Sequence, residues 1–395
     1  MQYTDKNREM PDDYLQDKGK DVLLTLSRGE SCAVIALGSA GKSNFLRHIT
    51  RSDIKRKHLT TKTEKDKDRA DKMLMVLLDP HNLLALEGRA LEMCGRSWAG
   101  YELMISRLWR TLLRQESQPS GKKVLDFTRS KDSLEAHYNR ITQAHPIISQ
   151  TGVRALENAI YDLIQLDDNL QVVFVMDDIE AFRHRLPDEY FESLRGLRDD
   201  FKGRVVYLTT SRSEMEQVVY TPTAHRDTVE AFVELFHGQT FYLDLLGIDE
   251  VKTMIGKLIT RYGWERLITE AVQDSLAENL YELTRGHAGL IRRAFDPAAR
   301  YQAYVSRNGE TSNLDQLAAN LLADAGIYKE CLIVLNGLSR GEHQQLHRVL
   351  KGEPIGYTYE MYTLGEKHII DHETGKIKIP LLALRLQANP EILGV

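Results

Sequence analysis

The sequence has few cysteines and no long apolar run. Its three cysteines, Cys32, Cys94 and Cys331, lie far apart and show neither a CxxC pair nor the Cys/His spacing of a zinc site. A disulfide framework and a zinc site are therefore not predicted, and a reducing compartment fits best. No apolar run approaches the roughly 20 residues that span a bilayer, and residues 1–21 are polar and lack the apolar core of a signal peptide. We expect a cytoplasmic protein that contacts no membrane.

An excess of positive charge is also missing. The chain carries 52 Lys and Arg against 57 Asp and Glu, a formal net charge of -5. A role on nucleic acid would therefore require a local basic face. With 395 residues, 42% of them hydrophobic, the chain is long enough for two or three domains. Composition alone does not choose between an enzyme and a binding protein.

Short apolar runs alternate with longer segments of helical period from Val22 onward. This alternation predicts a mostly parallel sheet covered by helices. The predicted strands are residues 32–37, 73–79, 171–178, 204–210 and 240–246. The charge-mixed stretch 51–72 is predicted to be a solvated loop, with a frayed helix or a basic contact surface as alternatives.

Helical period continues after the last predicted strand, with turns at residues 262–264 and 285–286. This part of the chain is predicted to be a small all-helical domain. From about Tyr328, two predicted helices precede "HIIDHETGKIKIP", which has the alternation of a hairpin around residues 373–375. Helices followed by a hairpin indicate a winged helix. The predicted domains are an N-terminal extension (1–20), a sheet-containing core (21–246), a helical lid (247–327) and a winged helix (328–395).

A glycine-rich turn follows the first predicted strand, where "GSAGKS" leads into the helical "NFLRHITR". Such a turn directs backbone N–H groups at phosphate from a helix N-terminus, while a Lys reaches the β and γ phosphates and a Ser binds Mg²⁺. Lys42 and Ser43 occupy these two positions. The first glycine of the pattern is replaced by Ala36, so a residue with a Cβ must make the strand exit. The candidate nucleotide contacts are Gly38, Ser39, Ala40, Gly41, Lys42, Ser43 and Asn44.

Two acids, Asp177 and Asp178, end the predicted strand 171–178. Ligands of open parallel sheets gather at the carboxyl ends of strands, where both these acids and the glycine-rich turn fall. One carboxylate can hold Mg²⁺ and the next can orient or activate the attacking water. The alternative is that the pair only caps the following helix.

Two further groups complete the predicted site. Arg212 follows a strand that ends in hydroxyl residues, and a guanidinium there can pair with the terminal phosphate. His287, in "LTRGHAGLIRRAF", is a candidate nucleotide contact from the helical domain, together with Arg292, although a His at a turn is more often a cap. Arg195 and Arg198 share one face of a predicted helix, where an arginine could reach the nucleotide of a neighbouring subunit or simply be solvated.

Taken in this order, residues 23–295 resemble the AAA+ and STAND group of P-loop ATPases. "VVFVMDDIEAF", "VVYLTTSR" and "TRGHAGLIR" are similar to the acid-ended strand, the sensor strand and the helical-domain motif of STAND proteins. A winged helix after the helical domain is also the order in the origin-recognition branch of AAA+. The resemblance implies an α/β fold, with a P-loop NTPase parallel sheet sandwiched by helices, then a small all-helical lid and a C-terminal winged helix.

The resemblance also implies roles for individual residues. Lys42 and Ser43 would bind phosphate and metal, Asp177 would hold Mg²⁺, Asp178 would be the catalytic acid and Arg212 the γ-phosphate sensor. ATP and Mg²⁺ are therefore the expected ligands.

Three departures from the family pattern favour binding over rapid hydrolysis. Ala36 replaces the first glycine, and Asp178 is shorter than the glutamate of most AAA+ hydrolases. Gly289 stands where origin-recognition relatives usually carry a sensor arginine. The main prediction is a slowly hydrolysing nucleotide switch. Because the chain offers no effector motif, we expect it to change conformation or self-associate to recruit a separate effector protein.

The alternative is a DNA-binding AAA+ ATPase of the origin-recognition or transposition-regulator kind. The segment that would enter the groove, "YTYEMYTLGEK", offers Lys367 as its one basic residue and carries two glutamates, which is poor chemistry for phosphate contact. Lys376 and Lys378 of the hairpin are better placed, and the stretch 51–72 could supplement them. A third possibility is a degenerate P-loop protein that binds no nucleotide and serves as a scaffold.

Overall fold

The computed structural model describes residues 10–60, 69–85, 88–116, 127–142, 149–219, 226–354 and 356–394. The chain divides into two compact units. The sheet unit contains Gln16–Ile35 and Ser43–Phe241, and the helical unit contains Met1–Leu15, Ala36–Lys42 and Tyr242–Val395. The predicted phosphate-binding loop, Ala36–Lys42, thus groups with the helical unit, although β1 and α2, the elements it connects, lie almost wholly in the sheet unit.

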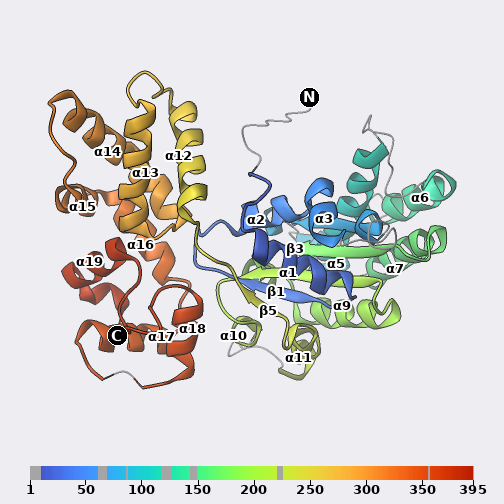
Figure 1. Cartoon of the computed structure of the whole chain (residues 1–395). Coiled ribbons are helices and arrows are strands. Elements are labelled where there is room, and N and C mark those ends of the chain that lie inside the picture. The colour runs from blue at the N-terminus through green and yellow to red at the C-terminus, as the bar shows by residue number, and fades with distance from the viewer. Residues whose placement is uncertain are drawn as a thin grey trace. The chain divides into compact units, whose positions relative to one another are not determined.

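A five-stranded sheet forms the centre of the sheet unit (Figure 1). Its strands lie in the order β2-β3-β4-β1-β5, and β1 to β4 are parallel. Their bounds are β1 (Cys32–Ile35), β2 (Met73–Leu78), β3 (Gln171–Met176), β4 (Val205–Ser211) and β5 (Thr240–Tyr242). All five predicted strands are confirmed. β1 to β4 are buried along nearly their whole length, as expected of a parallel sheet covered on both faces.

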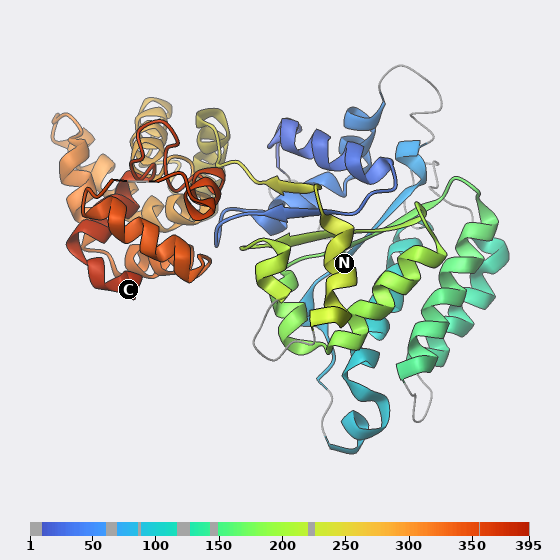
Figure 2. The ribbon, with the colours of Figure 1, turned by 90° about the horizontal axis from the view of Figure 1, so that it is seen from below.

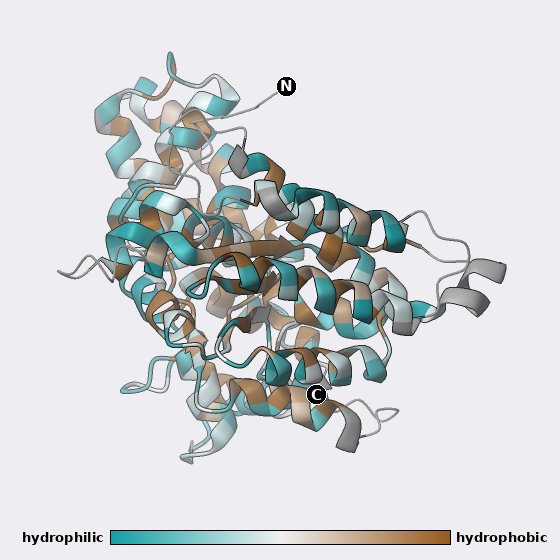
Figure 3. Cartoon of the chain, turned by 90° about the vertical axis from the view of Figure 1, so that its right-hand side faces the viewer, coloured by the Kyte–Doolittle hydropathy of each residue, from teal (hydrophilic) through white to brown (hydrophobic). Residues whose placement is uncertain are grey.

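Helices cover both faces of this sheet (Figure 2). On one side lie α1 (Gln16–Ser27), α2 (Lys42–Ile49) and α3 (Ser52–Leu59). The other side carries α5 (Gly88–Glu116), α6 (Lys131–Thr142), α7 (Ser149–Leu166), α8 (Ile179–Arg185), α9 (Asp188–Asp200), α10 (Met215–Val219) and α11 (Arg226–Val233). Alternate strand residues, such as Val172, Phe174 and Met176, join one core with α5, α7, α9 and α11. Hydrophobic residues concentrate between the layers (Figure 3).

The strand register places the predicted site at one edge of the sheet. Ile35, the last residue of β1, is paired with Ser211, and Met176, the last residue of β3, is paired with Thr209. Both strands therefore end beside the carboxyl end of β4. The phosphate-binding loop and the acid pair start from this edge because each follows directly on its strand.

The helical unit begins with three packed helices, α12 (Ile248–Tyr262), α13 (Glu270–Thr284) and α14 (Ala288–Arg307). Both predicted turns are present. Gly263 ends α12 with a left-handed φ of 69°, and Arg285 and Gly286 end α13 with φ values of 49° and 86°. A Cβ on Gly286 would lie 2.0 Å from the carbonyl oxygen of Leu246, so only glycine fits this turn.

The rest of the helical unit contains more helices, and the hairpin of the predicted winged helix lies between the last two of them. The helices are α15 (Leu314–Leu322), α16 (Ala325–Leu335), α17 (Arg340–Leu350), α18 (Tyr359–Glu366) and α19 (Pro380–Ala388). The predicted hairpin is present but is reduced to one antiparallel bridge between Ile370 and Ile377. Its turn is closed by Asp371, which accepts hydrogen bonds from the N–H and the hydroxyl of Thr374.

The prediction of a solvated loop over residues 51–72 is wrong for its first part. Residues 52–59 form α3, which packs on α1. Lys55 is buried and donates to the carbonyl oxygen of Met73 at 2.6 Å, and burial lowers its pKa to about 8. Arg56 pairs with Asp71 at 2.5 Å. Lys55 and Arg56 therefore make contacts within the fold. Residues 61–68 lie outside the described residues. None of the described helices has the length and apolar character needed to cross a membrane.

Candidate nucleotide-binding site

The phosphate-binding loop tolerates alanine at its first position. Ala36 is buried, and the loop residues with left-handed backbone are Ser39, with φ of 58°, and Gly41, with φ of 107°. A Cβ on Gly41 would also lie 3.0 Å from the hydroxyl of Tyr14. Glycine is thus required by conformation at Gly41, and Ala36 makes the strand exit without a left-handed backbone.

Lys42 is held over the start of the same loop. Its Nζ donates to the carbonyl oxygens of Ala36 at 2.9 Å and Leu37 at 3.0 Å. These are main-chain contacts, which alanine provides as well as glycine. The ammonium group is therefore oriented at the end of β1, where α2 begins.

A buried histidine binds the loop from α14. His287 has no exposed surface, and its Nδ1 accepts the N–H of Leu290 at 3.2 Å. Because Nδ1 is an acceptor, Nε2 carries the proton and donates to the carbonyl oxygen of Gly38 at 3.0 Å. The pKa of His287 is lowered to about 4, mainly by burial. The hydrogen bond to Gly38 raises it, and the charges of Lys42 and Arg292 lower it. Both ring nitrogens are used, so His287 positions the loop rather than offering a nitrogen to a phosphate.

Two further helical segments pack on the loop without room for a methyl group. A Cβ on Gly38 would lie 2.5 Å from the carbonyl oxygen of Ile333 in α16. A Cβ on Gly289, at the start of α14, would lie 2.6 Å from Cβ of Ser39. Gly289 is therefore a packing glycine, and its contact explains why no larger residue stands at this position.

The acid pair is organised by β4, its neighbour in the sheet. The hydroxyl of Thr210 donates to Oδ1 of Asp177 at 2.8 Å and accepts the N–H of Asp178 at 2.9 Å. Asp178 has a left-handed φ of 57° and makes no side-chain cap to α8. The capping alternative therefore does not explain this residue. Strained backbone of this kind is common at functional positions.

A third acid, which the sequence analysis did not single out, lies beside the pair. Glu180 accepts the N–H of Arg212 at 2.5 Å through Oε1, and its buried Oε2 has no hydrogen-bond partner among the described residues. Burial raises the pKa of Glu180, N–H donors lower it, and Asp178 raises it further. The guanidinium of Arg212 lies 4.0 Å from Asp178. The sequence feature that could have identified Glu180 is an acidic residue in the first turn of the helix that follows Asp177 and Asp178.

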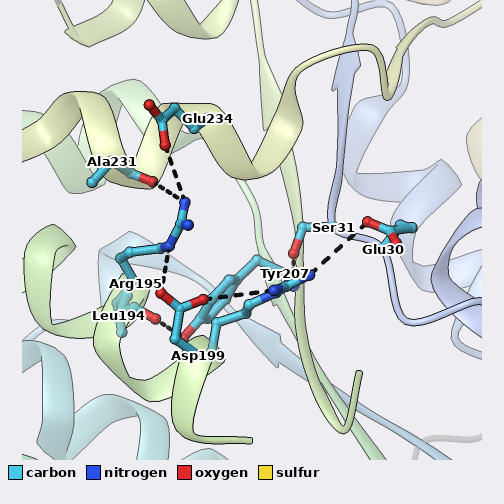
Figure 4. Close-up of polar contacts among 9 residues, drawn as sticks. Glu30, Ser31, Leu194, Arg195, Asp199, Tyr207, Ala231 and Glu234 are labelled. Atoms are coloured by element: carbon cyan, nitrogen blue, oxygen red, sulfur yellow. Dashed lines mark hydrogen bonds and ion pairs between the residues drawn. The ribbon is translucent and has the colours of Figure 1, made fainter. Parts of the chain in front are cut away.

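Arg195 and Arg198 are both used within the sheet unit (Figure 4). Arg195 bonds Asp199 at 2.8 Å, the carbonyl oxygen of Ala231 at 2.8 Å and Glu234 at 3.4 Å. Arg198 pairs with Asp199 at 3.6 Å, and its side chain is 13% exposed. The two side chains form an ion-pair network that joins α9 to neighbouring elements. Both alternatives given above for Arg195 and Arg198, solvation and contact with the nucleotide of a neighbouring subunit, therefore fit these residues poorly.

The residues at this edge of the sheet fit a magnesium nucleotide. Ser43 and Asn44 are exposed in the first turn of α2, and Asp177 is a carboxylate at the end of β3. Hydroxyl and carboxylate oxygens are the ligands that Mg²⁺ takes from P-loop proteins. No group of three metal-binding side chains occurs among the described residues.

The surface of the predicted winged helix differs from the prediction at its basic residue, Lys367. Lys367 is buried, and its Nζ donates to Oε1 of Glu342 at 2.7 Å, which also accepts the hydroxyl of Thr363 at 2.9 Å. Lys367 is therefore not available for a phosphate of DNA. The exposed side chains of this surface include Tyr357, Tyr359, Tyr362, Lys376 and Lys378, together with His372, Glu373 and Thr374 of the hairpin turn.

Neither a family model nor a curated protein matches this chain. Among solved structures, it is similar to the Walker-type ATPase paby2304 of Pyrococcus abyssi, with 14% identity, 96% and 95% coverage of the two chains and a TM-score of 0.46. The ORC2 protein of Aeropyrum pernix in ADPNP–ADP complexes has 12% identity, 96% and 91% coverage and a TM-score of 0.43. The ORC1 protein of Aeropyrum pernix in complex with DNA has 11% identity, 95% and 92% coverage and a TM-score of 0.37. The function of this chain is argued below from its own residues.

Proposed function

We propose that this chain is a P-loop ATPase of the AAA+ type with an origin-recognition-like architecture, in which the bound nucleotide controls the helical unit. The observation that carries the proposal is the set of contacts on Gly38. His287 of α14 donates to its carbonyl oxygen, and Ile333 of α16 packs against its Cα. A change in the loop on binding phosphate therefore acts directly on the lid and on the first helix of the winged helix.

The residues have separate roles in this proposal. Gly41 and the start of α2 provide N–H groups for phosphate, and Lys42 adds positive charge. Ser43 and Asp177 would hold Mg²⁺, which neutralises developing charge on the phosphates. Asp178 would orient the attacking water, and Arg212, beside it, would contact the terminal phosphate.

Slow hydrolysis follows from the environment of Asp178. Its carboxylate lies near both Arg212 and the buried Glu180. The ion pair with Arg212, at 4.0 Å, engages one oxygen of this carboxylate and leaves it less available to orient the attacking water. An ATPase built in this way holds its nucleotide long enough to act as a switch.

DNA binding is the favoured output of the switch. Lys376 and Lys378 are exposed on the hairpin, and three exposed tyrosines lie at and just before α18. Lysines can neutralise phosphates, and aromatic rings can stack on bases or contact sugars. Because Lys367 is buried, the hairpin rather than α18 would supply the charge. A DNA contact of this kind would be weak and strongly dependent on salt.

Recruitment of a separate protein is the second candidate output. Tyrosines are enriched at protein interfaces, and Tyr357, Tyr359 and Tyr362 present a large exposed aromatic area. Self-association could use the same surface. A triple substitution of these tyrosines by Ser, compared with Lys376→Ala combined with Lys378→Ala, would separate a protein interface from a DNA contact.

The proposal is tested by titrating the protein with ATP and Mg²⁺ beside Lys42→Ala, with binding followed by calorimetry. We expect micromolar affinity that falls at least about 100-fold in Lys42→Ala, because the charged Lys contact with phosphate is lost. Arg47→Ala, an exposed base on α2, is the matched control and should bind as the wild type does. Wild-type protein that binds no nucleotide would reject the proposal in favour of the scaffold alternative.

A further inference from the structure

Helix α16 lies directly on the phosphate-binding loop. A Cβ placed on Gly38 would be 2.5 Å from the carbonyl oxygen and 2.7 Å from Cγ2 of Ile333. Real Cβ atoms do not approach backbone this closely, so the helix and the loop are in contact through main chain. Both segments belong to the helical unit. A displacement of the loop toward α16 at Gly38 therefore requires a displacement of α16.

One turn before Ile333, the same helix directs a carboxylate at the loop. Glu330 is 1% exposed, and its Oε1 lies 2.1 Å from the position that a Cβ on Gly289 would take. Cβ of Ser39 lies 2.6 Å from the same position. The side chains of Glu330 and Ser39 therefore meet at Gly289, where α16, the loop and α14 come together.

The carboxylate of Glu330 is poorly compensated. Its Oε1 has no hydrogen-bond partner in the part of the chain that the structure describes. Its Oε2 lies 3.7 Å from Nε of Arg293, whose side chain is 58% exposed. Buried carboxylates normally accept several hydrogen bonds, and an unpaired one lowers stability. A neutral residue of the same shape would satisfy packing better, so the fold alone does not account for an acid at this position.

The loop beside Glu330 is the one that binds phosphate in the proposed function, on which this inference rests. Like charges a few ångströms apart in a buried site repel strongly. A carboxylate seated against Ser39 therefore opposes an anion on the loop, and it opposes ATP more than ADP because ATP carries one more negative charge.

We propose that Glu330 is a charge gate: α16 rests on the loop when ADP or no nucleotide is bound, and the phosphates of ATP drive Glu330, and with it α16, away from Gly38 and Ser39. The gate makes α16 the element that distinguishes the two nucleotides. Because α16 is the first helix of the winged helix, its release transmits the nucleotide state to the C-terminal surface.

The test compares affinities for Mg–ATP and Mg–ADP in the wild type, Glu330→Gln and Glu373→Gln. Gln keeps the shape of Glu330 and removes its charge, so we expect ATP affinity to rise about tenfold and ADP affinity to rise less. Glu373 lies exposed in the hairpin turn, so Glu373→Gln makes the same change in net charge and should leave both affinities unaltered. Equal or weaker ATP binding in Glu330→Gln overturns the gate while leaving the proposed function intact. Absence of nucleotide binding in all three proteins rejects the proposed function, and the gate with it.

Hydrogen exchange measures the movement itself. In the wild type, saturating Mg–ATP should increase exchange of the α16 amides, whereas Mg–ADP should not. In Glu330→Gln, α16 should stay protected with either nucleotide. Unchanged protection of α16 in the wild type with ATP bound would show that the helix is not displaced and would overturn the gate even if affinities change.

Discussion

The loop after β1 and the acid pair after β3 start from one edge of the same sheet, but different parts of the chain support them. Gly38 of the loop is bonded by His287, which lies 249 residues away in the sequence and belongs to the helical unit. Asp177 is bonded by Thr210, which lies 33 residues away on the adjacent strand of the sheet.

In the proposed function, this difference separates phosphate binding from hydrolysis. Phosphate binding depends on contacts that the helical unit makes with the loop, so a change in those contacts would change it. The geometry of the acids is built into the sheet, whose parallel register is fixed by backbone hydrogen bonds, so it stays constant. The predictions below test this separation, from the largest expected effect to the smallest.

Replacing Asp178 by Asn should affect hydrolysis alone. A group that orients or activates water contributes about 10²–10⁴-fold to the rate, so we expect the single-turnover rate of Asp178→Asn to fall by at least about 100-fold. ATP affinity should stay within about threefold of the wild type. Lys42→Ala should show the opposite pattern, with a large loss of ATP affinity. Equal losses of affinity in the two variants would contradict the separation of binding from catalysis.

Acid should weaken the support of the loop through His287. The pKa of His287 is about 4 in the folded protein against an ordinary 6.5, so the unfolded chain binds the proton first. Stability from this group is present above pH 6.5 and is lost as the pH falls to about 4, by about 3 kcal/mol in total. Urea unfolding at several pH values should show this loss in the wild type.

His287→Gln provides the comparison for the acid experiment. The variant lacks the titrating group, so its free energy of unfolding should fall less steeply between pH 6.5 and 4 than that of the wild type. If the two curves are parallel over this range, the protonation of His287 does not contribute to stability.

Gly289→Ala should disturb the loop by overpacking. The new Cβ would lie 2.1 Å from Glu330 and 2.6 Å from Ser39. We expect a loss of about 2 kcal/mol in the free energy of unfolding, together with weaker nucleotide binding. Gly196→Ala in α9 is the matched control, because nothing lies within 4 Å of its added Cβ. The control should be neutral or slightly stabilising, since alanine favours a helix. If Gly289→Ala is as stable as Gly196→Ala, the packing of Glu330 and Ser39 around Gly289 leaves room for a methyl group.

Thr210→Val should have the smallest effect on the protein. We expect this effect to be limited to the positions of Asp177 and Asp178. The isosteric change removes one hydrogen bond to Asp177 and one from Asp178, which we expect to lower stability by about 1–2 kcal/mol and to slow hydrolysis. Thr209→Val is the control, because among the described residues the hydroxyl of Thr209 hydrogen-bonds the sulfur of Met215, at 3.7 Å, and neither acid. A larger loss of ATP affinity than of hydrolysis in Thr210→Val would show that the acids also serve the grip on phosphate.

Much of the sheet could be predicted because a buried parallel strand has a continuous apolar run bounded by polar residues. The five runs from residue 32 to residue 246 became strands, and the two acids fell at the end of β3. The stretch 51–72 was predicted less well. Its charges suggested solvent, but Lys55 is buried and donates to the carbonyl oxygen of Met73 at the start of β2, a contact that no local pattern predicts. Arg195 and Arg198 share a helix face as predicted and both bond Asp199 of the same helix, but their other partners, such as Ala231 and Glu30, come from elsewhere in the chain.

The sequence alone determined where the phosphate-binding loop lies, which residues carry its charge and where the acids fall. These features are local, because a left-handed turn needs Gly41, a helix start needs free N–H groups and a strand end exposes its next residues. Only the tertiary structure decided that Ala36 needs no left-handed backbone, that His287 bonds the loop and that Glu330 faces it. The contacts of His287 and Glu330 depend on packing between residues about 250 or more positions apart, and the spacing of residue types within a segment carries no record of such contacts.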